Sequence, residues 1–210
     1  MNPIDIRHGI IHSMNKDLII IKLGGSVITD KTKKKGTFRK KVVERLAQEI
    51  KAARNKEKIN LILVHGAGSF AHPIAKKYKL AQGYLGPESV KGFALTKIAV
   101  LKLNLLIWQA LERAGLKSCI VESGAVIKAS SAKIKKFDTE FIQSLLVKGA
   151  IPILSGDVVL DQKMGFSIVS GDQIASYLAG KFKAKKVVFA SDVDGIFDKD
   201  PHVYKNAKII

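Results

Sequence analysis

Five short apolar runs, each closed by loop-forming residues, constrain the fold of this chain more than any other feature of its sequence. They are LIIIKL (18–23), INLILVH (59–65), KSCIVES (117–123), AIPILS (150–155) and KKVVFAS (185–191). Such runs are typical of strands buried on both faces of a sheet. Helical patterns lie between them, at 40–54, 88–114, 139–148 and 172–182. This alternation predicts an α/β fold, a three-layer αβα sandwich with a mainly parallel open sheet.

The segment 158–170 departs from the alternation. Two short alternating runs flank its turn-rich centre, which predicts a β-hairpin beside the main sheet. With 210 residues, of which 47% are hydrophobic, the chain can bury a sizeable core. We expect one domain over residues 18–210, preceded by an N-terminal extension at 1–17.

Glycine and polar residues gather directly after four of the five runs. The segments are GGSVITDK after the first run, HGAGSFAHP after the second, SGD (155–157) after the fourth and SDVDG (191–195) after the last. Ligands of open α/β sheets bind outside the carboxyl ends of the strands. The sequence therefore predicts one ligand site at this edge of the sheet.

The first of these segments has the chemistry of an anion site. Gly24 and Gly25 would let backbone N–H groups approach a phosphate closely, and Lys22 would add a point charge. A Gly-Gly pair alone is explained equally well as a tight turn from a strand into a helix. Its functional interpretation depends on the neighbouring segments.

The second segment supports the phosphate interpretation over a dinucleotide one. Gly66, Gly68 and Ala71 have the spacing of a dinucleotide fingerprint, but no acidic residue ends a strand about twenty positions later. His72 follows the glycines and is a candidate donor to a phosphate. For His65, at the end of the run, we expect a structural role.

Acidic residues occur at several predicted strand ends and helix starts. Asp172 opens a predicted helix, so capping and a functional role are both open for it. Asp157, Asp192 and Asp194 could hold a lysine or face a metal-bound nucleotide. No metal-ligand spacing is present, so we expect no metal held by the protein alone and a divalent ion that arrives with a nucleotide.

The formal charge of +18 requires an anionic partner, such as a nucleic acid, a membrane surface or a phosphorylated metabolite. The lysine clusters lack interleaved aromatic residues, so no nucleic acid is expected. Polar residues interrupt the apolar stretch 98–111, so no membrane span is expected. The N-terminus has no secretory signal pattern, which favours a cytoplasmic location.

Taken in order, five segments resemble the amino acid kinase superfamily, and most of all its isopentenyl phosphate kinase branch. They are IIKLGGSVITDK, LILVHGAGSFAHPIAKKY, PILSGDVVLD, IVSGDQIASYLA and FASDVDGIFDKDP. The histidine at position 72 distinguishes this branch. The resemblance implies ATP-dependent phosphorylation of isopentenyl phosphate in isoprenoid biosynthesis. ATP and Mg²⁺ would be the cofactors and a small-molecule phosphate the partner, and a homodimer is compatible with it.

The resemblance also assigns roles to individual residues. The catalytic residues would be Lys22, Lys31 and His72. The ATP-binding residues would be Lys22, Gly24, Gly25, Ser26, Gly68 and Asp192. The substrate-binding residues would be Ala67, His72, Gly156 and Asp157. Residues of the helix from Glu88, such as Phe93, Leu95 and Ile98, could line a pocket for the prenyl tail or form a plain core face.

Two features depart from the family pattern. Ala71 stands where the family has glycine, which is harmless if its φ is negative. The chain ends at KNAKII, where family members continue, so we expect a largely complete acceptor side and a missing part of the nucleotide side. Two alternatives stay open: a kinase of another small phosphate or phosphonate such as fosfomycin, and a noncatalytic remnant that binds phosphate or nucleic acid.

Overall fold

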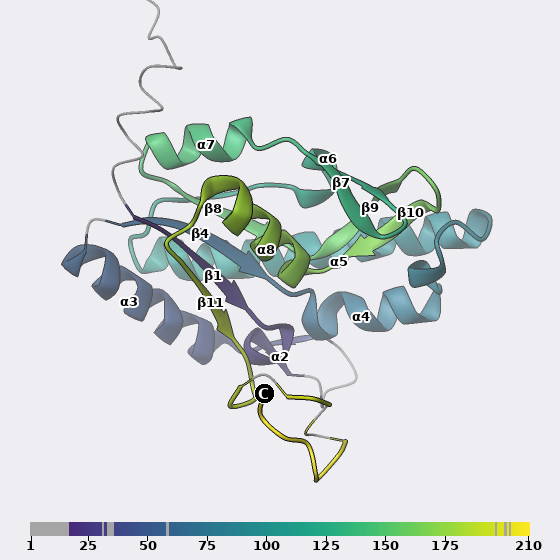
Figure 1. The fold of residues 1–210 in the computed structure, drawn as a ribbon, viewed down its shortest axis with the longest axis horizontal. Helices are drawn as coiled ribbons and strands as arrows, with labels where there is room; N and C mark the ends of the chain where they lie inside the picture. Colours follow the sequence, from purple (N-terminus) through teal and green to yellow (C-terminus); the bar gives the residue numbers. More distant parts are fainter. Residues whose placement is uncertain are drawn as a thin grey trace, which may run out of the picture.

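A parallel five-stranded sheet forms the centre of the computed structural model, which describes residues 17–30, 32, 36–57, 59–195, 197–199, 201 and 203–210. Its strands are β1 (Leu18–Leu23), β4 (Asn60–His65), β5 (Ser118–Ile120), β8 (Ile151–Ser155) and β11 (Lys186–Ala190). They pair in the order β11-β1-β4-β8-β5, all parallel (Figure 1). All five predicted runs are strands of one sheet, which confirms the α/β prediction.

Helices cover both faces of this sheet. They are α3 (Lys40–Lys56), α5 (Pro87–Arg113), α7 (Glu140–Val147) and α8 (Gly171–Phe182), close to the predicted helical ranges. Because side chains alternate along a strand, β4 contributes side chains to a hydrophobic core on each face of the sheet. Leu61 and Leu63 pack with α3 and α5, whereas Ile62 and Val64 pack with α7 and α8. Figure 1 shows α8 in front of the sheet and α5 behind it, which is the predicted three-layer sandwich.

A second, four-stranded sheet lies beside the first, in the order β10-β9-β6-β7. The predicted hairpin is confirmed as β9 (Asp157–Asp161) and β10 (Gly165–Val169). A hairpin that we did not predict extends it, formed by β6 (Ile127–Ser130) and β7 (Lys133–Phe137). We did not predict β7 because three of its five residues, KIKKF, are lysines, and lysine is depleted in strands. Lysines are common on edge strands, and β7 lies at the edge of its sheet.

One acidic residue fastens the turns of both hairpins. The Asp161 carboxylate accepts hydrogen bonds from the N–H groups of Ser131, Ala132, Lys163 and Met164, at 2.8–3.1 Å. Ser131 and Ala132 have φ of 52° and 59°, a conformation that is unfavourable for these residues. Burial by itself would raise the pKa of Asp161. The hydrogen bonds donated to its carboxylate outweigh burial and hold this pKa well below its ordinary value.

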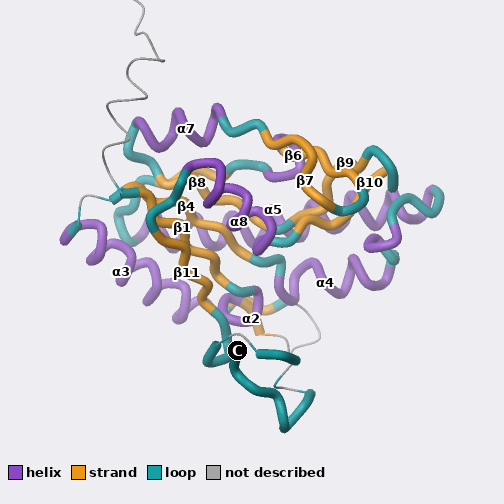
Figure 2. Tube along the Cα trace, in the orientation of Figure 1, coloured by secondary structure: helices purple, strands orange, loops and turns teal. Residues whose placement is uncertain are grey.

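Shorter elements complete the described chain. They are α2 (Gly25–Ile28), β2 (Thr29–Asp30), β3 (Thr37–Phe38), α4 (Gly68–Lys77), the 3-10 helix η1 (Leu80–Gln82) and α6 (Ser123–Val126). Most of the segment after β11 is loop and lies near α2 (Figure 2). No helix in the described ranges is both long and apolar enough to cross a membrane.

Helix α4 begins inside the second glycine-rich segment, where no helix was predicted. Glycine and proline interrupt the helical pattern at 68 and 73, and this hides a ten-residue helix. His72 consequently lies in a helix rather than beyond a loop. Ala71 is buried in the same helix with a negative φ, so its replacement of a glycine introduces no strain.

Candidate active site

The two predicted glycine-rich segments touch each other at the carboxyl ends of β1 and β4. A Cβ on Gly25 would lie 2.7 Å from Gly68 Cα, and one on Gly66 would lie 2.9 Å from Gly25 N. Thr29 Oγ1 locks this contact, because it donates to Gly25 O at 2.6 Å and accepts from Ser69 N at 2.9 Å. These glycines are therefore required for the two segments to meet.

The end of β11 joins the same place from the other side. Gly24 N donates to Ala190 O at 2.8 Å, and Ser26 Oγ donates to Asp192 Oδ1 at 2.6 Å. Predicted nucleotide-side residues that are 166 positions apart thus lie in direct contact. Asp194 is exposed, and Lys31 lies outside the described residues.

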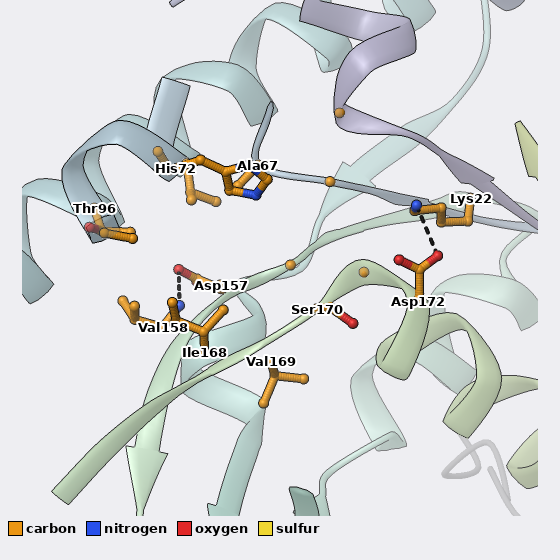
Figure 3. Close-up of a pocket in the computed structure, with 17 residues that line it drawn as sticks. Lys22, Ala67, His72, Thr96, Asp157, Val158, Ile168, Val169, Ser170 and Asp172 are labelled. Carbon is orange, nitrogen blue, oxygen red and sulfur yellow. Dashed lines mark hydrogen bonds and ion pairs between the residues drawn. The ribbon is translucent and has the colours of Figure 1, made fainter. Parts of the chain in front are cut away.

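A cavity of about 200 Å³ opens beside these segments (Figure 3). Six of the predicted residues line it: Lys22, Gly25, Ala67, His72, Gly156 and Asp157. Gly24, Ser26, Gly68 and Asp192 do not line it. The other lining residues are Gly66, Ala71, Ala75, Thr96, Val100, Val158, Ile168, Val169, Ser170, Gly171 and Asp172. The cavity therefore combines charged groups and glycines with a wall of small apolar side chains.

Lys22 is held by an acidic residue whose role was open. Its ammonium lies 2.9 Å from Asp172 Oδ1, and its side chain is only 15% exposed. The cap of α8 is a different residue, Ser170, which accepts from Gln173 N at 3.1 Å and donates its own N–H to Gln173 Oε1 at 2.8 Å. The S-x-x-Q spacing is the signal that could have identified this cap. Asp172 is thereby left to pair with Lys22.

Asp157 is buried at the start of β9 and bound from two sides. Its carboxylate accepts from Val158 N at 2.8 Å and from Lys97 Nζ at 2.5 Å. Lys97 also donates to Glu122 Oε1 at 2.5 Å. Burial raises the pKa of Asp157 to about 7, although Lys97 opposes this rise. Lys97 and Glu122 were not predicted. Lys97 is 25 positions from Glu122 and 60 from Asp157, and no local pattern connects residues so far apart.

His65 and His72 occupy different environments. His65 is fully buried, and its ring contacts Gly66 O and the Asn104 side chain. Burial lowers the pKa of His65, which favours a neutral ring. This agrees with the structural role expected for it. The His72 side chain instead lies along the cavity in Figure 3, between Ala67 and Thr96.

Comparison with known proteins identifies the family. The profile described as "Amino acid kinase family" matches residues 17–210. The chain belongs to the amino acid kinase family. Aspartate kinase from Synechocystis, 19% identical with a TM-score of 0.63, has the same fold.

Much more similar members of this family are isopentenyl phosphate kinases. The enzyme from Methanothermobacter thermautotrophicus is 36% identical over 199 residues, which are 92% of this chain and 74% of that protein. The enzyme from Methanocaldococcus jannaschii is 38% identical over 189 residues, 85% of this chain and 70% of that protein. A solved isopentenyl phosphate kinase structure, 36% identical, superimposes with a TM-score of 0.83 and covers 91% of this chain and 78% of its own.

Phe93, Leu95 and Ile98, for which a tail pocket and a plain core face were both open, do not line the cavity. Leu95 and Ile98 are 42% and 52% exposed, on the outer face of α5. Phe93 packs against Phe166, with ring centroids 5.4 Å apart, and does not line the cavity. The residues of α5 that line it are Thr96 and Val100, one helical turn apart on the inner face.

The described residues contain no group of three or more His, Cys, Asp or Glu side chains that could hold a metal ion. The carboxylates around the cavity are already paired, Asp172 with Lys22 and Asp157 with Lys97. These paired carboxylates are therefore poor ligands for a cation held by the protein alone.

Proposed function

We propose that this chain transfers the γ-phosphoryl group of ATP to isopentenyl phosphate and forms isopentenyl diphosphate. The observation that carries the proposal is the composition of the cavity. Lys22 and His72 lie at a cavity whose wall is formed by small apolar residues such as Ala75, Val100 and Ile168. This combination suits a phosphate with a short apolar tail. The relatives named isopentenyl phosphate kinase support the same acceptor.

The chemistry requires little covalent help from the protein. An oxygen of the acceptor phosphate attacks the γ-phosphorus, the bond to the β-phosphate oxygen breaks, and ADP leaves with the electron pair. The acceptor is already anionic, so no general base is needed. Lys22, oriented by Asp172, would neutralise charge on the transferred group, and the His72 imidazole would donate a hydrogen bond to the acceptor phosphate.

The nucleotide would lie against Gly24, Gly25, Ser26 and Gly68, with Asp192 beside them. We propose that Mg²⁺ arrives with ATP, and it would supply positive charge to the nucleotide phosphates beside Lys22. Lys31 is proposed as a further contact of the transferred phosphoryl group. A homodimer and a cytoplasmic location are proposed as well.

Turnover of ATP with isopentenyl phosphate, compared between the wild type and His72→Ala, tests the proposal. Loss of a positioned donor to the acceptor phosphate is expected to lower kcat/KM by about 10²-fold to 10³-fold. Lys76→Ala is the matched control, because Lys76 is exposed on the same helix and does not line the cavity. It is expected to retain wild-type kcat/KM.

The two alternatives predict different outcomes. A kinase of another small phosphate would turn over that compound and reject isopentenyl phosphate. A noncatalytic remnant would turn over no small phosphate and would bind RNA in a salt-sensitive manner. Either result would contradict the proposal.

A further inference from the structure

Two carboxylates share one ammonium at the wall of the cavity. Lys97 Nζ lies 2.5 Å from both Asp157 Oδ2 and Glu122 Oε1. The three groups come from α5, from the start of β9 and from the loop before α6. With all three ionised, the cluster carries one net negative charge.

Of the two carboxylates, Asp157 is the one on which a negative charge is less favourable. The side chain of Asp157 is fully buried, whereas those of Lys97 and Glu122 are 24% and 44% exposed. Although burial opposes it, the hydrogen bond from Lys97 lowers the pKa of Glu122. Burial instead raises the pKa of Asp157 to about 7. Asp157 is therefore the member of the cluster that can change its charge near neutral pH.

The position of Asp157 makes this charge important for a ligand. Asp157 lines the cavity with Lys22, His72 and Asp172, which are the other titratable groups around it. Asp172 is paired with Lys22, and among the described residues Lys97 and Glu122 are the charged groups that act on the Asp157 carboxyl. An anionic acceptor would enter a cavity that contains a buried anion, unless that anion is neutralised.

We propose that Asp157 takes up a proton when the anionic acceptor enters the cavity, and that Lys97 is the positioning residue that keeps this uptake at neutral pH. The inference rests on the proposed function, because it takes the acceptor to be a phosphate bound beside Asp157. The proton comes from solvent and is released when the product leaves, so the net reaction is unchanged.

The direction follows from the charges. A phosphate anion near Asp157 favours its neutral form and so raises its pKa further. If the rise is about one unit, acceptor binding at pH 7.5 is accompanied by uptake of about half a proton by Asp157. Without Lys97, Asp157 would be protonated already in the free protein at this pH. Acceptor binding would then be accompanied by proton uptake at Asp157 only at higher pH.

Calorimetric titration of isopentenyl phosphate into the protein tests this inference. Titrations in buffers of different ionisation enthalpy, from pH 6.5 to 9, give the number of protons taken up at each pH. Asp157→Asn removes the titrating carboxyl but keeps an acceptor for Val158 N. The difference from the wild type therefore gives the proton uptake that depends on the Asp157 carboxyl.

Three variants with substitutions in α5 test whether Lys97 sets the pH range of the proton uptake. Lys97→Met is expected to move the uptake to higher pH by about one unit or more, with binding retained at pH 7.5. Lys97→Arg keeps the charge and is expected to restore a wild-type pH dependence. Lys102→Met changes an exposed lysine of the same helix and is expected to leave the proton count unchanged. Melting temperatures of all variants verify that they are folded.

Each result has a distinct meaning. Equal proton counts in the wild type and Asp157→Asn at every pH would overturn the inference and leave the proposed function standing. Weaker binding by Lys97→Met with no change in the pH range of proton uptake would give Lys97 a merely structural role. This result would contradict the proposal that Lys97 keeps the uptake at neutral pH. Failure of the wild type to bind isopentenyl phosphate would contradict the proposed function itself.

Discussion

Lys22 and Asp172 show how a residue acquires its role from a partner distant in the sequence. Lys22 belongs to β1 and Asp172 to the first turn of α8, and their charged groups lie 2.9 Å apart at the wall of the cavity (Figure 3). The lysine was predictable from its place before a glycine pair. The carboxylate was not, because a helix start gives every acidic residue a second explanation.

Asp172→Asn is expected to lower kcat by about tenfold with little effect on stability. The variant leaves the Lys22 ammonium charged but removes the carboxylate that orients it, and an ion pair with one exposed partner contributes only about 1 kcal/mol or less to folding. Steady-state kinetics and thermal melts measure the two effects separately.

Glu49→Gln is the matched control, because Glu49 forms an exposed ion pair with Arg45 on α3, at 3.4 Å. It is expected to change neither kcat nor the melting temperature. An Asp172→Asn variant with wild-type kcat would refute the positioning role.

At the scale of elements, the second sheet depends on Asp161. Its four accepted N–H groups belong to the turns of two hairpins, β6–β7 and β9–β10. A further bond connects this unit to α8, because Gln173 Nε2 donates to Ala132 O at 3.0 Å. Since β9 and β10 carry Asp157, Val158 and Ile168 into the cavity wall, Asp161 supports the site without lining it.

Asp161→Asn is expected to lower the free energy of unfolding by about 2–3 kcal/mol at pH 7, because an amide NH₂ cannot accept the hydrogen bonds that a carboxylate accepts. The folded-state pKa is depressed, so the stabilisation is present above the unfolded-state pKa of about 4 and is lost as the pH falls further. Urea unfolding measures the free energy of unfolding of the wild type and of Asp161→Asn. The difference between the two values should be constant from pH 8 to 5 and should become smaller below about pH 4.

Asp138→Asn is the control for this prediction. Asp138 is exposed and accepts one hydrogen bond, from Glu140 N at 3.1 Å. Its loss is expected to change the free energy of unfolding by about 1 kcal/mol or less. A pH-independent effect of Asp161→Asn would show that the carboxylate charge does not stabilise the turns.

At the scale of the whole molecule, α5 presents apolar side chains on an exposed outer face. Ile98, Leu101 and Leu105 are 42–52% exposed and recur at helical spacing, so they lie on one side of the helix. A second copy of the chain is the partner that the proposed homodimer would place there.

Leu101→Glu is expected to convert a dimer into a monomer, because two carboxylates would be buried at a symmetric contact. Light scattering after size-exclusion chromatography measures the mass. Val203→Glu, a change at an apolar residue that is 67% exposed and lies outside α5, is expected to leave the dimer intact. A wild-type protein that remains monomeric at high concentration would contradict the homodimer.

The sequence by itself determined the main sheet, its covering helices and the edge at which the site lies. Continuous apolar runs and helical periodicity are local signals that predict the strands and helices. Because ligands of open α/β sheets bind at the carboxyl ends of the strands, the predicted strands also indicate where the site lies. Gly24, Gly25, His72 and Asp157 were predicted in this way or through the family resemblance. Strands rich in lysine and helices interrupted by glycine and proline, such as β7 and α4, lack these local signals and were missed.

Only the tertiary structure decided which side chains act on one another. It joined Lys22 to Asp172 and Asp157 to Lys97, and it placed Thr96 rather than Leu95 at the cavity. The burial that raises the pKa of Asp157 depends on which elements enclose its carboxyl. Periodicity and spacing report what lies nearby along the chain, whereas charge coupling and burial depend on distances in space.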